Sequence, residues 1–536
     1  MQIPTGQSMI DQPEYFNFAT DVFDRWAGEQ PEALALWWVN DGRTRELRFT
    51  FAELGELSRR AASVFQESGI LPGDPAMVML PRVPEWWISM LGLTRLGAVP
   101  VPCTPQLTPH DLAYRIEVGG IRAVVTDSEG AGKLPGFAGI GWQIDSPMPG
   151  WLHLGEALLH AGPEFAGPAT RAAAPGIIYF TSATTGSPKM VLHTQSSYGL
   201  GHEVTGKLWL DLGPADVHWN TADLGWAKAA WSSFFGPWHC GACLFVWDAR
   251  GKFSAAHMLD VLGSYPITSL CAPPTALRMI VREDLGNRRF PCLRHCVTAG
   301  EPLNPSVFHA WKAATGLPVY EGYGQSETVI LIGNFKSLGY PVVPGSMGRA
   351  TPGYEVCLVD DHLEPVPDGE EGEIAVRLGE NRPVGIFKEY WKCPEQTTRH
   401  FRGEWYLTGD RATRDAEGYF WFIGRKDDVI KSSGYRIGPF EVESALASHA
   451  AVLDVAVIGK PDEVRGQIVK AFVVLRHGHE PTDDTRRGLQ DHCKHLVAPY
   501  KYPREIEFVA ELPKTVSGKT RRFELRRRQG EARHAQ

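Results

Sequence analysis

Short apolar runs alternate with amphipathic stretches along the chain from about residue 70 onward. Pro75–Leu80 has the length and side chains of a buried strand, whereas Glu85–Leu96 has the spacing of an amphipathic helix. Strands that alternate with helices in this way indicate parallel sheets in a layered α/β architecture. Further strands of this series are predicted at Ala98–Val101, Ala123–Thr126, Gly176–Phe180, Cys243–Trp247 and His295–Thr298.

The pattern changes near Val356. Two short predicted strands, Val356–Val359 and Glu373–Arg377, flank a segment rich in Pro, Asp and Gly, which indicates a smaller β module. The polar run 425–428 is a predicted hinge between a large N-terminal domain (1–424) and a small mobile α+β domain (429–536). For the small domain we predict helices at Glu441–Ala447 and near Arg487–Leu496, and strands near Val455 and at Val469–Leu475.

Length and composition favour a globular enzyme. A chain of 536 residues is too long for one core, so about two to four domains are expected. Its 43% hydrophobic and 22% charged residues are typical of a soluble protein, and a net charge of −8 argues against a nucleic-acid binder. The basic cluster formed by Arg521, Arg522, Arg526, Arg527 and Arg528 is expected to be a solvated tail, with anion binding as the alternative.

One uncharged stretch, Ala229–Trp247, is long enough for a membrane span to be considered. It contains Gly236, Pro237 and His239, so a buried helix, a break and then a strand explain it better. The N-terminus has neither the apolar core of a signal peptide nor an Arg-rich amphipathic pattern, which predicts a cytoplasmic protein without a membrane span.

The nine cysteines form no framework pattern, which fits a reducing compartment. Cys240 with Cys243, and Cys292 with Cys296, are closely spaced but lack the repeated pairs of a zinc ribbon. Because both pairs sit in apolar, strand-like surroundings, we expect buried free thiols.

The segment Phe180–Lys189 carries the strongest chemical pattern. A predicted strand opens into Thr181, four further hydroxyl residues, a Gly, a Pro and Lys189. Hydroxyls and successive backbone N–H groups bind phosphoryl oxygens, and a lysine adds a point charge. The spacing is not that of a Walker loop, so the segment predicts a different phosphate-binding loop. An ordinary hydroxyl-rich surface loop is the alternative.

Five other segments support a nucleotide-binding site when they are considered together with this loop, although each is weak evidence by itself. Glu321–Thr328 combines an aromatic residue, a carboxylate and a hydroxyl, and Trp405–Asp410 ends in a carboxylate that could accept from a ribose diol. A surface turn is the alternative for Asp410. The remaining segments are Gly424–Asp428, Lys431–Gly438 and Pro513–Lys519.

In this order and at these separations, the segments resemble the core motifs of the adenylate-forming superfamily of AMP-binding enzymes. The C-terminal segments Ser433–Gly438, Ala498–Pro503 and Pro513–Lys519 resemble the medium-chain acyl-CoA synthetase branch most closely, and Pro81–Trp87 and Val297–Glu301 support it. The resemblance implies an ATP-dependent acid–thiol ligase that joins a carboxylic acid to AMP and then transfers the acyl group to CoA. The implied co-substrates are ATP with Mg²⁺, CoA and the acid, and a homo-oligomer stays open.

The resemblance also implies roles for individual residues. Lys519 would bridge the attacking carboxylate and the α-phosphate, Thr328 would touch the α-phosphate, and Glu327 would bind Mg²⁺. Tyr323 would stack on adenine, and Asp410 and Arg425 would bind the ribose. The full implied nucleotide site is Thr181, Ser182, Thr184, Thr185, Gly186, Lys189, Gly300, Glu301, Glu321, Gly322, Tyr323, Gly324, Gln325, Thr328, Asp410, Arg425 and Lys519.

For the second half-reaction, the resemblance implies that the small domain swings about Asp427. That motion would withdraw Lys519 and bring in the segment Lys431–Gly438. The implied CoA contacts are Ser433, Gly434, Tyr435, Arg436, Arg465 and Lys494, although a solvated helix face is an equal alternative for Lys494.

Two positions depart from the family pattern. Ala183 replaces a usual Gly in the phosphate loop, where a Cβ restricts the backbone. Val329 replaces a usual Gly at the mouth of the acyl tunnel, so the chain length of the acid is open. Trp226 matches a residue that lines the acyl pocket, with an ordinary core tryptophan as its alternative.

Three other functions stay open at this point. They are an aryl or branched short-chain acid CoA ligase, an adenylating enzyme that loads a carrier protein, and a catalytically weakened nucleotide-binding regulatory homologue. A hydrolase is excluded, because Thr328 occupies the position where a nucleophile elbow needs a glycine.

Overall fold

The computed structural model describes residues 12–181, 188–379, 382–433, 435–462, 464–498, 500–515 and 519–534. Its first layer is an all-parallel sheet with strand order β4-β3-β5-β6-β7, where the apolar runs predicted as strands are fully buried. The strands are β3 Pro75–Met79, β4 Val99–Pro102, β5 Ala123–Thr126, β6 Ile140–Gln143 and β7 Leu152–His153. The helices of this region are α2 Phe51–Glu67, α3 Pro84–Leu96, α4 Pro109–Gly119, α5 Ser128–Gly132 and α6 Leu154–His160.

The second layer is a longer sheet with order β16-β15-β14-β13-β12-β10-β11-β1-β2. Its centre, from β14 to β1, is parallel, and only β2, β15 and β16 run antiparallel to their neighbours. The strands are β1 Leu34–Asn40, β2 Glu46–Thr50, β10 Val217–Asn220, β11 Cys243–Asp248, β12 Ser269–Cys271, β13 His295–Ala299, β14 Val319–Tyr323, β15 Ile332–Gly333 and β16 Arg349–Ala350. The accompanying helices are η1 Ala19–Phe23, α1 Asp24–Glu29, α7 Gln195–Val204, η2 Thr205–Trp209, α8 Ala227–Ser233, α9 Phe235–His239, α10 Ala255–Ser264, α11 Pro274–Ile280, α12 Pro305–Thr315 and η3 Lys336–Leu338.

One strand of the predicted parallel series is antiparallel. The strand β8 (Pro175–Phe180) pairs with β9 (Met190–Thr194), which in turn pairs antiparallel with β19 (Glu389–Tyr390). The reason is the short connection, since the loop after Phe180 returns directly as β9, whereas a parallel partner would need a long crossover. The expectation of parallel pairing for Gly176–Phe180 was therefore wrong.

The predicted β module and the small C-terminal unit each have their own sheet. The module is antiparallel, with strands β17 Val356–Val359, β18 Glu371–Arg377, β20 Phe401–Arg402, β21 Trp405–Arg414 and β22 Phe420–Arg425, and with helix α13 Pro394–His400. The C-terminal sheet contains β23 Ile430–Ser432, β24 Tyr435–Ile437, β25 Val452–Asp462, β26 Gly466–Leu475 and β27 Glu505–Phe508. Its helices are α14 Pro439–Ala447, α15 Asp483–Leu496 and α16 Arg522–His534. The mixed α/β fold class predicted from the sequence is confirmed.

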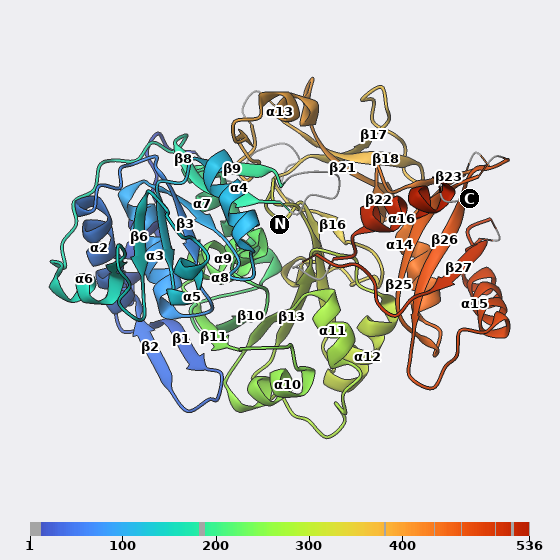
Figure 1. The fold of residues 1–536 in the computed structure, drawn as a ribbon, viewed down its shortest axis with the longest axis horizontal. Helices are drawn as coiled ribbons and strands as arrows, with labels where there is room; N and C mark the ends of the chain where they lie inside the picture. The colour runs from blue at the N-terminus through green and yellow to red at the C-terminus, as the bar shows by residue number, and fades with distance from the viewer. Residues whose placement is uncertain are drawn as a thin grey trace.

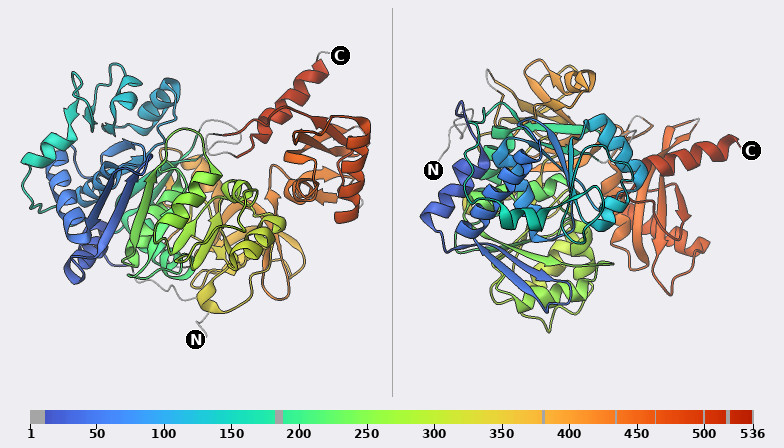
Figure 2. Two further views of the ribbon diagram at one scale, coloured as in Figure 1. Left: turned by 90° about the horizontal axis from the view of Figure 1, so that it is seen from below. Right: turned by 60° about the vertical axis from the view of Figure 1, so that its left-hand side comes forward.

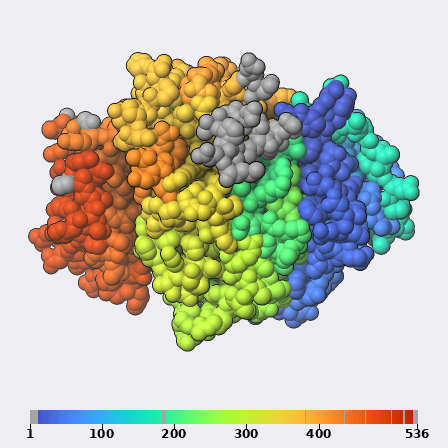
Figure 3. Space-filling model, turned by 180° about the vertical axis from the view of Figure 1, so that it is seen from behind, coloured from blue at the N-terminus to red at the C-terminus, as the bar shows by residue number. Residues whose placement is uncertain are grey.

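Figure 1 shows the N-terminal layers at the left and centre, the β module above them, and the C-terminal sheet at the right. In Figure 2, α16 extends outward beside the C-terminal sheet. From behind, the C-terminal unit lies directly against the part of the N-terminal region that contains β16 and the β module (Figure 3). The interface includes a hydrogen bond of 3.4 Å from Asn304 Nδ2 to the carbonyl of Ser444.

The uncharged stretch after Lys228 folds as predicted, into α8, a break, α9 and the buried strand β11. Within the residues that the model describes, no helix combines the length and apolarity that crossing a bilayer requires. Cys240, Cys243 and Cys296 are buried free thiols as expected, but Cys292 is exposed because it lies in a turn ahead of β13.

The basic C-terminal cluster is only in part the solvated tail that the sequence predicted, because Arg521, Arg527 and Arg528 are exposed but Arg522 and Arg526 are half-buried. Arg522 begins helix α16, and its guanidinium binds both carboxylate oxygens of Glu443 at 2.7 and 2.8 Å. Arg526, one turn later, binds Asp428 at 2.7 Å. Arg522 therefore fastens the helix to the rest of the C-terminal unit, and Arg526 fastens it to the segment 425–428. The sequence did not indicate these pairs, because Glu443 and Asp428 are far from the arginines along the chain.

Candidate active site

The predicted site residues converge at the carboxyl ends of adjacent parallel strands. Gly300 and Glu301 follow β13, Glu321–Tyr323 form the end of β14, and Trp226 lies in the loop after β10. Strands β10, β12, β13 and β14 are neighbours in the sheet (Figure 1). Ligands of open α/β sheets bind at this edge. The edge therefore forms one candidate site from segments far apart in sequence.

A hydrogen-bond network centred on Asp410 joins the sheet to the β module. Tyr323 Oη and Gln325 Nε2 both donate to Asp410 Oδ2 at 2.7 Å. Arg425, opposite Asp410 in the β21–β22 ladder, places Nε 3.7 Å from Oδ1. Burial raises the pKa of Asp410, and the charge of Arg425 and the two hydrogen bonds oppose that rise. Three predicted nucleotide residues thus hold this carboxylate in a fixed orientation.

The carboxylate of Glu327 is oriented by a residue that the sequence did not single out. Tyr390 Oη donates to Glu327 Oε1 at 2.7 Å, and Lys189 Nζ lies 5.0 Å from the centroid of the Tyr390 ring. The ends of the phosphate loop meet at the same place, because Thr181 N donates to the Lys189 carbonyl at 2.8 Å. Tyr390 therefore links the predicted metal ligand to the predicted phosphate lysine. Ser182, Ala183, Thr184, Thr185 and Gly186 lie outside the described residues.

Thr328 is fully buried, and its hydroxyl is engaged within the chain. It donates to the Val329 carbonyl at 2.8 Å and accepts from Gln325 N at 3.0 Å. Val329 is buried as well, and its methyl groups lie 3.0 Å from where a Cβ on Gly201 would stand and 2.6 Å from one on Gly385. The two glycines leave room for the side chain that departs from the family pattern.

Three predicted nucleotide residues lie beneath the site and support its packing. Glu321 is buried and accepts from Leu303 N at 3.2 Å, and burial raises its pKa to about 8. A Cβ on Gly322 would lie 2.3 Å from Ile330 Cδ1, and one on Gly324 would lie 2.4 Å from the indole of Trp231. Both positions need glycine because large side chains approach the backbone closely.

Lys519 reaches this site from the C-terminal unit. Its backbone N–H donates to Thr515 Oγ1 at 3.1 Å, which shapes the turn that carries it. Lys519 is exposed to solvent, yet the protein around it displaces enough water to lower its pKa. The negative charges of Glu301, Asp410 and Glu327 oppose that effect, and Arg425 adds to it. Lys519 is therefore within electrostatic range of residues from all three predicted parts of the nucleotide site.

A second lysine at the site was missed by the sequence reasoning. Lys228, in the first turn of α8, donates from Nζ to the carbonyl of Ala299. The next residue, Gly300, has a φ of +100°, and a Cβ there would lie 3.5 Å from Lys228 Nζ. One feature of the sequence could have singled out Lys228: it is the charged residue that immediately precedes the uncharged stretch Ala229–Trp247.

The predicted CoA residues lie on one edge of the C-terminal sheet. Ser433, in the left-handed region at φ 51°, accepts from Arg465 Nη1 at 3.2 Å, and the exposed Tyr435 stacks on Tyr500 with ring centroids 4.1 Å apart. Arg436 instead faces the β module, 3.5 Å from Glu371.

Lys494 stands apart from this edge and matches the solvated alternative. It is exposed on α15, where it pairs with Asp491 at 2.8 Å. Gly434 lies outside the described residues.

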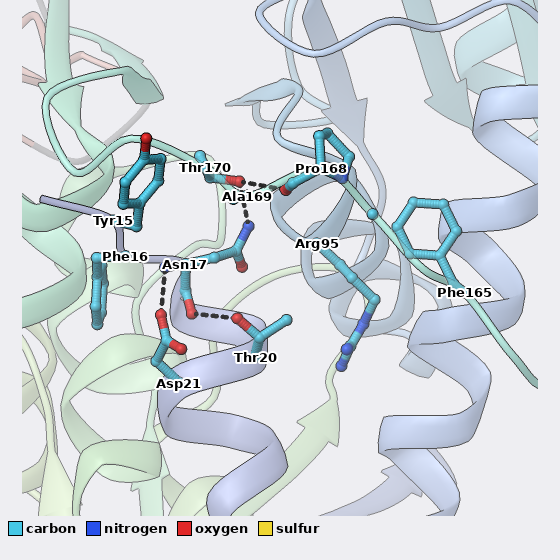
Figure 4. Close-up of a pocket in the computed structure, with 11 residues that line it drawn as sticks. Tyr15, Phe16, Asn17, Thr20, Asp21, Arg95, Phe165, Pro168, Ala169 and Thr170 are labelled. Atoms are coloured by element: carbon cyan, nitrogen blue, oxygen red, sulfur yellow. Dashed lines mark hydrogen bonds between the residues drawn. The ribbon is translucent and has the colours of Figure 1, made fainter.

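A cavity of about 240 Å³ lies elsewhere, between the N-terminal segment and the loop 165–170 (Figure 4). Its polar walls include Asn17, Asp21 and Arg95, and none of the predicted site residues lines it. Arg95 is ion-paired with Asp24 at 2.6 Å. The described residues hold no group of three or more His, Cys, Asp or Glu side chains arranged to bind a metal.

Comparison with known families gives two matches. Residues 23–391 match the model of the AMP-binding enzymes, and residues 441–519 match the model of the AMP-binding enzyme C-terminal domain.

Curated proteins resemble the chain over most of its length. It is 46% identical to the mitochondrial acyl-coenzyme A synthetase ACSM3 of Mus musculus, over 97% of this chain and 92% of that protein. It is 48% identical to the mitochondrial acyl-coenzyme A synthetase ACSM5 of Homo sapiens, over 98% of this chain and 92% of that protein.

Among solved structures, the anthranilate CoA ligase AuaEII in complex with anthranoyl-AMP has a TM-score of 0.88 at 30% identity, covering 98% of this chain and 99% of that one. A benzoate CoA ligase from Burkholderia xenovorans LB400 has a TM-score of 0.84 at 28% identity, covering 95% of this chain and 100% of that one.

Proposed function

This chain belongs to the family of AMP-binding enzymes, and from that premise we propose that it is an ATP-dependent acyl-coenzyme A synthetase for a medium-chain carboxylic acid. The acid would be activated as an acyl-adenylate with release of pyrophosphate. Transfer to CoA would then give the thioester and AMP. The observation that carries the proposal is the network in which Tyr323, Gln325 and Arg425 surround the Asp410 carboxylate where the long sheet meets the β module.

The first half-reaction needs positioning and charge neutralisation more than acid–base chemistry. A carboxylic acid with a pKa of about 4–5 is already ionised at neutral pH, so no general base is required. The protein must bring two anions together and neutralise charge on the transferring phosphoryl group. Lys519 would act between the carboxylate and the α-phosphate, and Lys189 with Thr181 at the base of the phosphate loop would hold the outer phosphates. Thr328 would contact the α-phosphate through its backbone, because its hydroxyl already donates to the carbonyl of Val329.

The Asp410 network would select the nucleoside. A carboxylate that already accepts from Tyr323 and Gln325 on Oδ2 keeps Oδ1 for a ribose hydroxyl, beside Arg425. Tyr323 would present its ring to adenine. Mg²⁺ would arrive with ATP, and Glu327 suits it as a single carboxylate ligand, because Tyr390 occupies only Oε1.

The second half-reaction would use a different placement of the C-terminal unit. A rotation about Asp427, in the segment 425–428 between the β module and the C-terminal sheet, would withdraw Lys519 and bring in Ser433, Tyr435 and Arg436. The domain limits 1–424 and 429–536 belong to this proposal. Domain rotation at a short polar linker is a common device for enzymes with two chemical steps.

The medium-chain acid is favoured over an aryl acid by the degree of similarity. The chain is 46–48% identical to the acyl-coenzyme A synthetases, against 28–30% for the anthranilate and benzoate ligases. Trp226, half-buried at the start of α8, would line the acyl pocket together with Val329. The curated relatives are named mitochondrial, and the cytoplasm remains the compartment that we propose from the sequence of this chain. The proposal includes a homo-oligomer as one arrangement of the enzyme.

One experiment tests the proposed function. Purified protein is incubated with ATP, Mg²⁺, CoA and a panel of straight, branched and aryl carboxylic acids, and AMP and thioester are measured. We expect kcat/KM to be highest for straight acids of medium length. AMP release without thioester formation from free CoA would point to a carrier protein instead, and ATP binding without turnover of any acid would overturn the enzymatic function.

A further inference from the structure

Lys228 occupies the junction between the two halves of the candidate site. It lies two residues after Trp226, which is predicted to line the acyl pocket. Its ammonium group donates to Ala299, the residue before the nucleotide loop Gly300–Glu301. The bond between the acyl group and the phosphate must form where the acyl pocket and the nucleotide loop meet. Lys228 is therefore beside the reacting atoms in the geometry of the proposed function.

The charges around Lys228 leave an excess of positive charge. Burial lowers the pKa of Lys228, Cys271 opposes this shift, the charge of Lys519 lowers the pKa further, and Glu301 also opposes the shift. Glu301 is already shared, since Oε1 accepts from Thr275 N at 3.2 Å and lies 3.6 Å from Arg278. Lys228 and Lys519 are close enough for their charges to interact, and the carboxylate that acts on both, Glu301, is already engaged, so the pair favours binding of an anion.

We propose that Lys228 is a further substrate-binding residue that holds the reacting carboxylate opposite Lys519 and stays in place for the second half-reaction. The inference rests on the proposed function. Lys519 belongs to the C-terminal unit, whereas Lys228 is anchored on α8 of the N-terminal region. A rotation of the C-terminal unit would remove the first lysine and leave the second.

Both steps can use a cation at the carboxylate oxygen that does not attack, because that oxygen becomes the carbonyl oxygen of the acyl-adenylate. In the first, a carboxylate oxygen attacks the α-phosphorus, the bond to the β-phosphate breaks and pyrophosphate leaves. In the second, the CoA sulfur adds to the acyl carbon while the thiol proton goes to water. The carbonyl electron pair moves onto oxygen, and it returns as the bond to AMP breaks. A fixed ammonium beside that oxygen would orient the carboxylate for attack in the first step and would stabilise the negative charge that develops on the carbonyl oxygen in the second.

The test compares Lys228→Met with Lys519→Ala in separate half-reactions. Acyl-AMP formation is followed by acid-dependent pyrophosphate exchange, and thioester formation is followed from supplied acyl-AMP and CoA. We expect Lys228→Met to lower both rates by about 100-fold, whereas Lys519→Ala lowers only the first. Lys207→Met is the matched control, because Lys207 is 57% exposed and pairs only with Glu203 in the neighbouring segment.

A second measurement distinguishes a substrate-binding role of Lys228 from a purely structural role of its hydrogen bond to Ala299. In Lys228→Met, KM for the acid should rise about tenfold or more, while KM for ATP and inhibition by the corresponding neutral alcohol stay within twofold. Lys228→Arg should recover part of the acid affinity. The assignment would be overturned if both half-reactions were unchanged, or if only acyl-AMP formation were lost. It would also be overturned if KM rose equally for the acid and for ATP while the melting temperature fell. If the wild-type protein itself performs neither half-reaction, the proposed function fails first.

Discussion

Arg526 binds two residues of the predicted hinge 425–428: Nη2 donates to Asp428 Oδ1 at 2.7 Å, and Nη1 donates to the carbonyl of Asp427 at 3.1 Å. Arg522 approaches the other oxygen of Asp428 to 3.7 Å. Lys519 lies only three residues before Arg522 in the sequence. The segment that carries Lys519 is therefore fastened to the hinge. A rotation at Asp427 that turns its carbonyl must break the bond to Arg526.

The first prediction concerns this contact. Arg526→Met should slow acyl-AMP formation by about 5- to 30-fold, equivalent to about 1–2 kcal/mol for a charged hydrogen bond, because the arrangement with Lys519 in the site loses support. Thioester formation from supplied acyl-AMP should be unchanged or faster. Arg528→Met on the same helix is the control, since Arg528 is exposed. Equal slowing of both half-reactions would show that the contact serves folding alone.

Lys519 gives the second prediction. Lys519→Ala should lower acyl-AMP formation by at least about 100-fold, because the cation between the carboxylate and the α-phosphate is lost. Thioester formation from supplied acyl-AMP should stay within about twofold. Lys514→Ala is the matched control, because Lys514 lies in the same segment and pairs with Asp454. Loss of both half-reactions in Lys519→Ala would contradict the division of labour between the two placements of the C-terminal unit.

Glu327 gives the third prediction, on metal dependence. Glu327→Gln should raise the Mg²⁺ concentration needed for half-maximal acyl-AMP formation and lower the maximal rate by about 100-fold. Tyr390→Phe removes only the hydrogen bond to Oε1, so its loss should be about tenfold or less, with a smaller change in Mg²⁺ dependence. Titrations of pyrophosphate exchange with Mg²⁺ measure both variants. Identical Mg²⁺ curves for the wild type and Glu327→Gln would exclude the proposed metal contact.

Much of this architecture could be predicted from the sequence. The helix at Glu85–Leu96 and the strands at Ala123–Thr126 and Val356–Val359 agree with α3, β5 and β17 within a residue. Apart from the half-buried Glu85 and Cys357 these segments are buried, so the apolar runs located them correctly, but α3 is buried on all sides and is not the amphipathic helix that was expected. The pairing direction of β8 could not be predicted in the same way, because an apolar run has the same pattern in parallel and antiparallel sheets.

The candidate site residues were predicted from short sequence motifs. Residues that lie outside those motifs were therefore not predicted. Asp410, Tyr323 and Arg425 come together as the resemblance implied. Tyr390 and Lys228 belong to no short motif, and only the fold brings them to Glu327 and Gly300. Burial of Glu321 likewise depends on packing between distant segments.

Glu321 gives the fourth prediction, on pH. Its pKa is raised from 4.5 to about 8 by burial, so the folded protein binds more protons than the unfolded chain between these values. The contribution to stability is therefore fully present below pH 4.5 and is lost as the pH rises through about 8.

Glu321→Gln keeps the acceptor for Leu303 N and cannot ionise. Relative to this variant, the wild-type free energy of unfolding should fall by on the order of 4 kcal/mol between pH 5 and pH 9. Urea unfolding at several pH values measures the difference. A constant difference across that range would show that Glu321 ionises normally in the folded protein.

Val329 gives the last prediction, on substrate length. Its side chain is buried against Gly201 and Gly385 at the predicted mouth of the acyl pocket. Val329→Gly should open this space and shift the optimum of kcat/KM toward longer straight acids. It should also cost about 2 kcal/mol of stability through the lost packing. Leu331→Ala, two residues along and equally buried but packed in the cluster with the β module, controls for destabilisation alone. If both variants leave the chain-length profile unchanged, Val329 does not limit the acid.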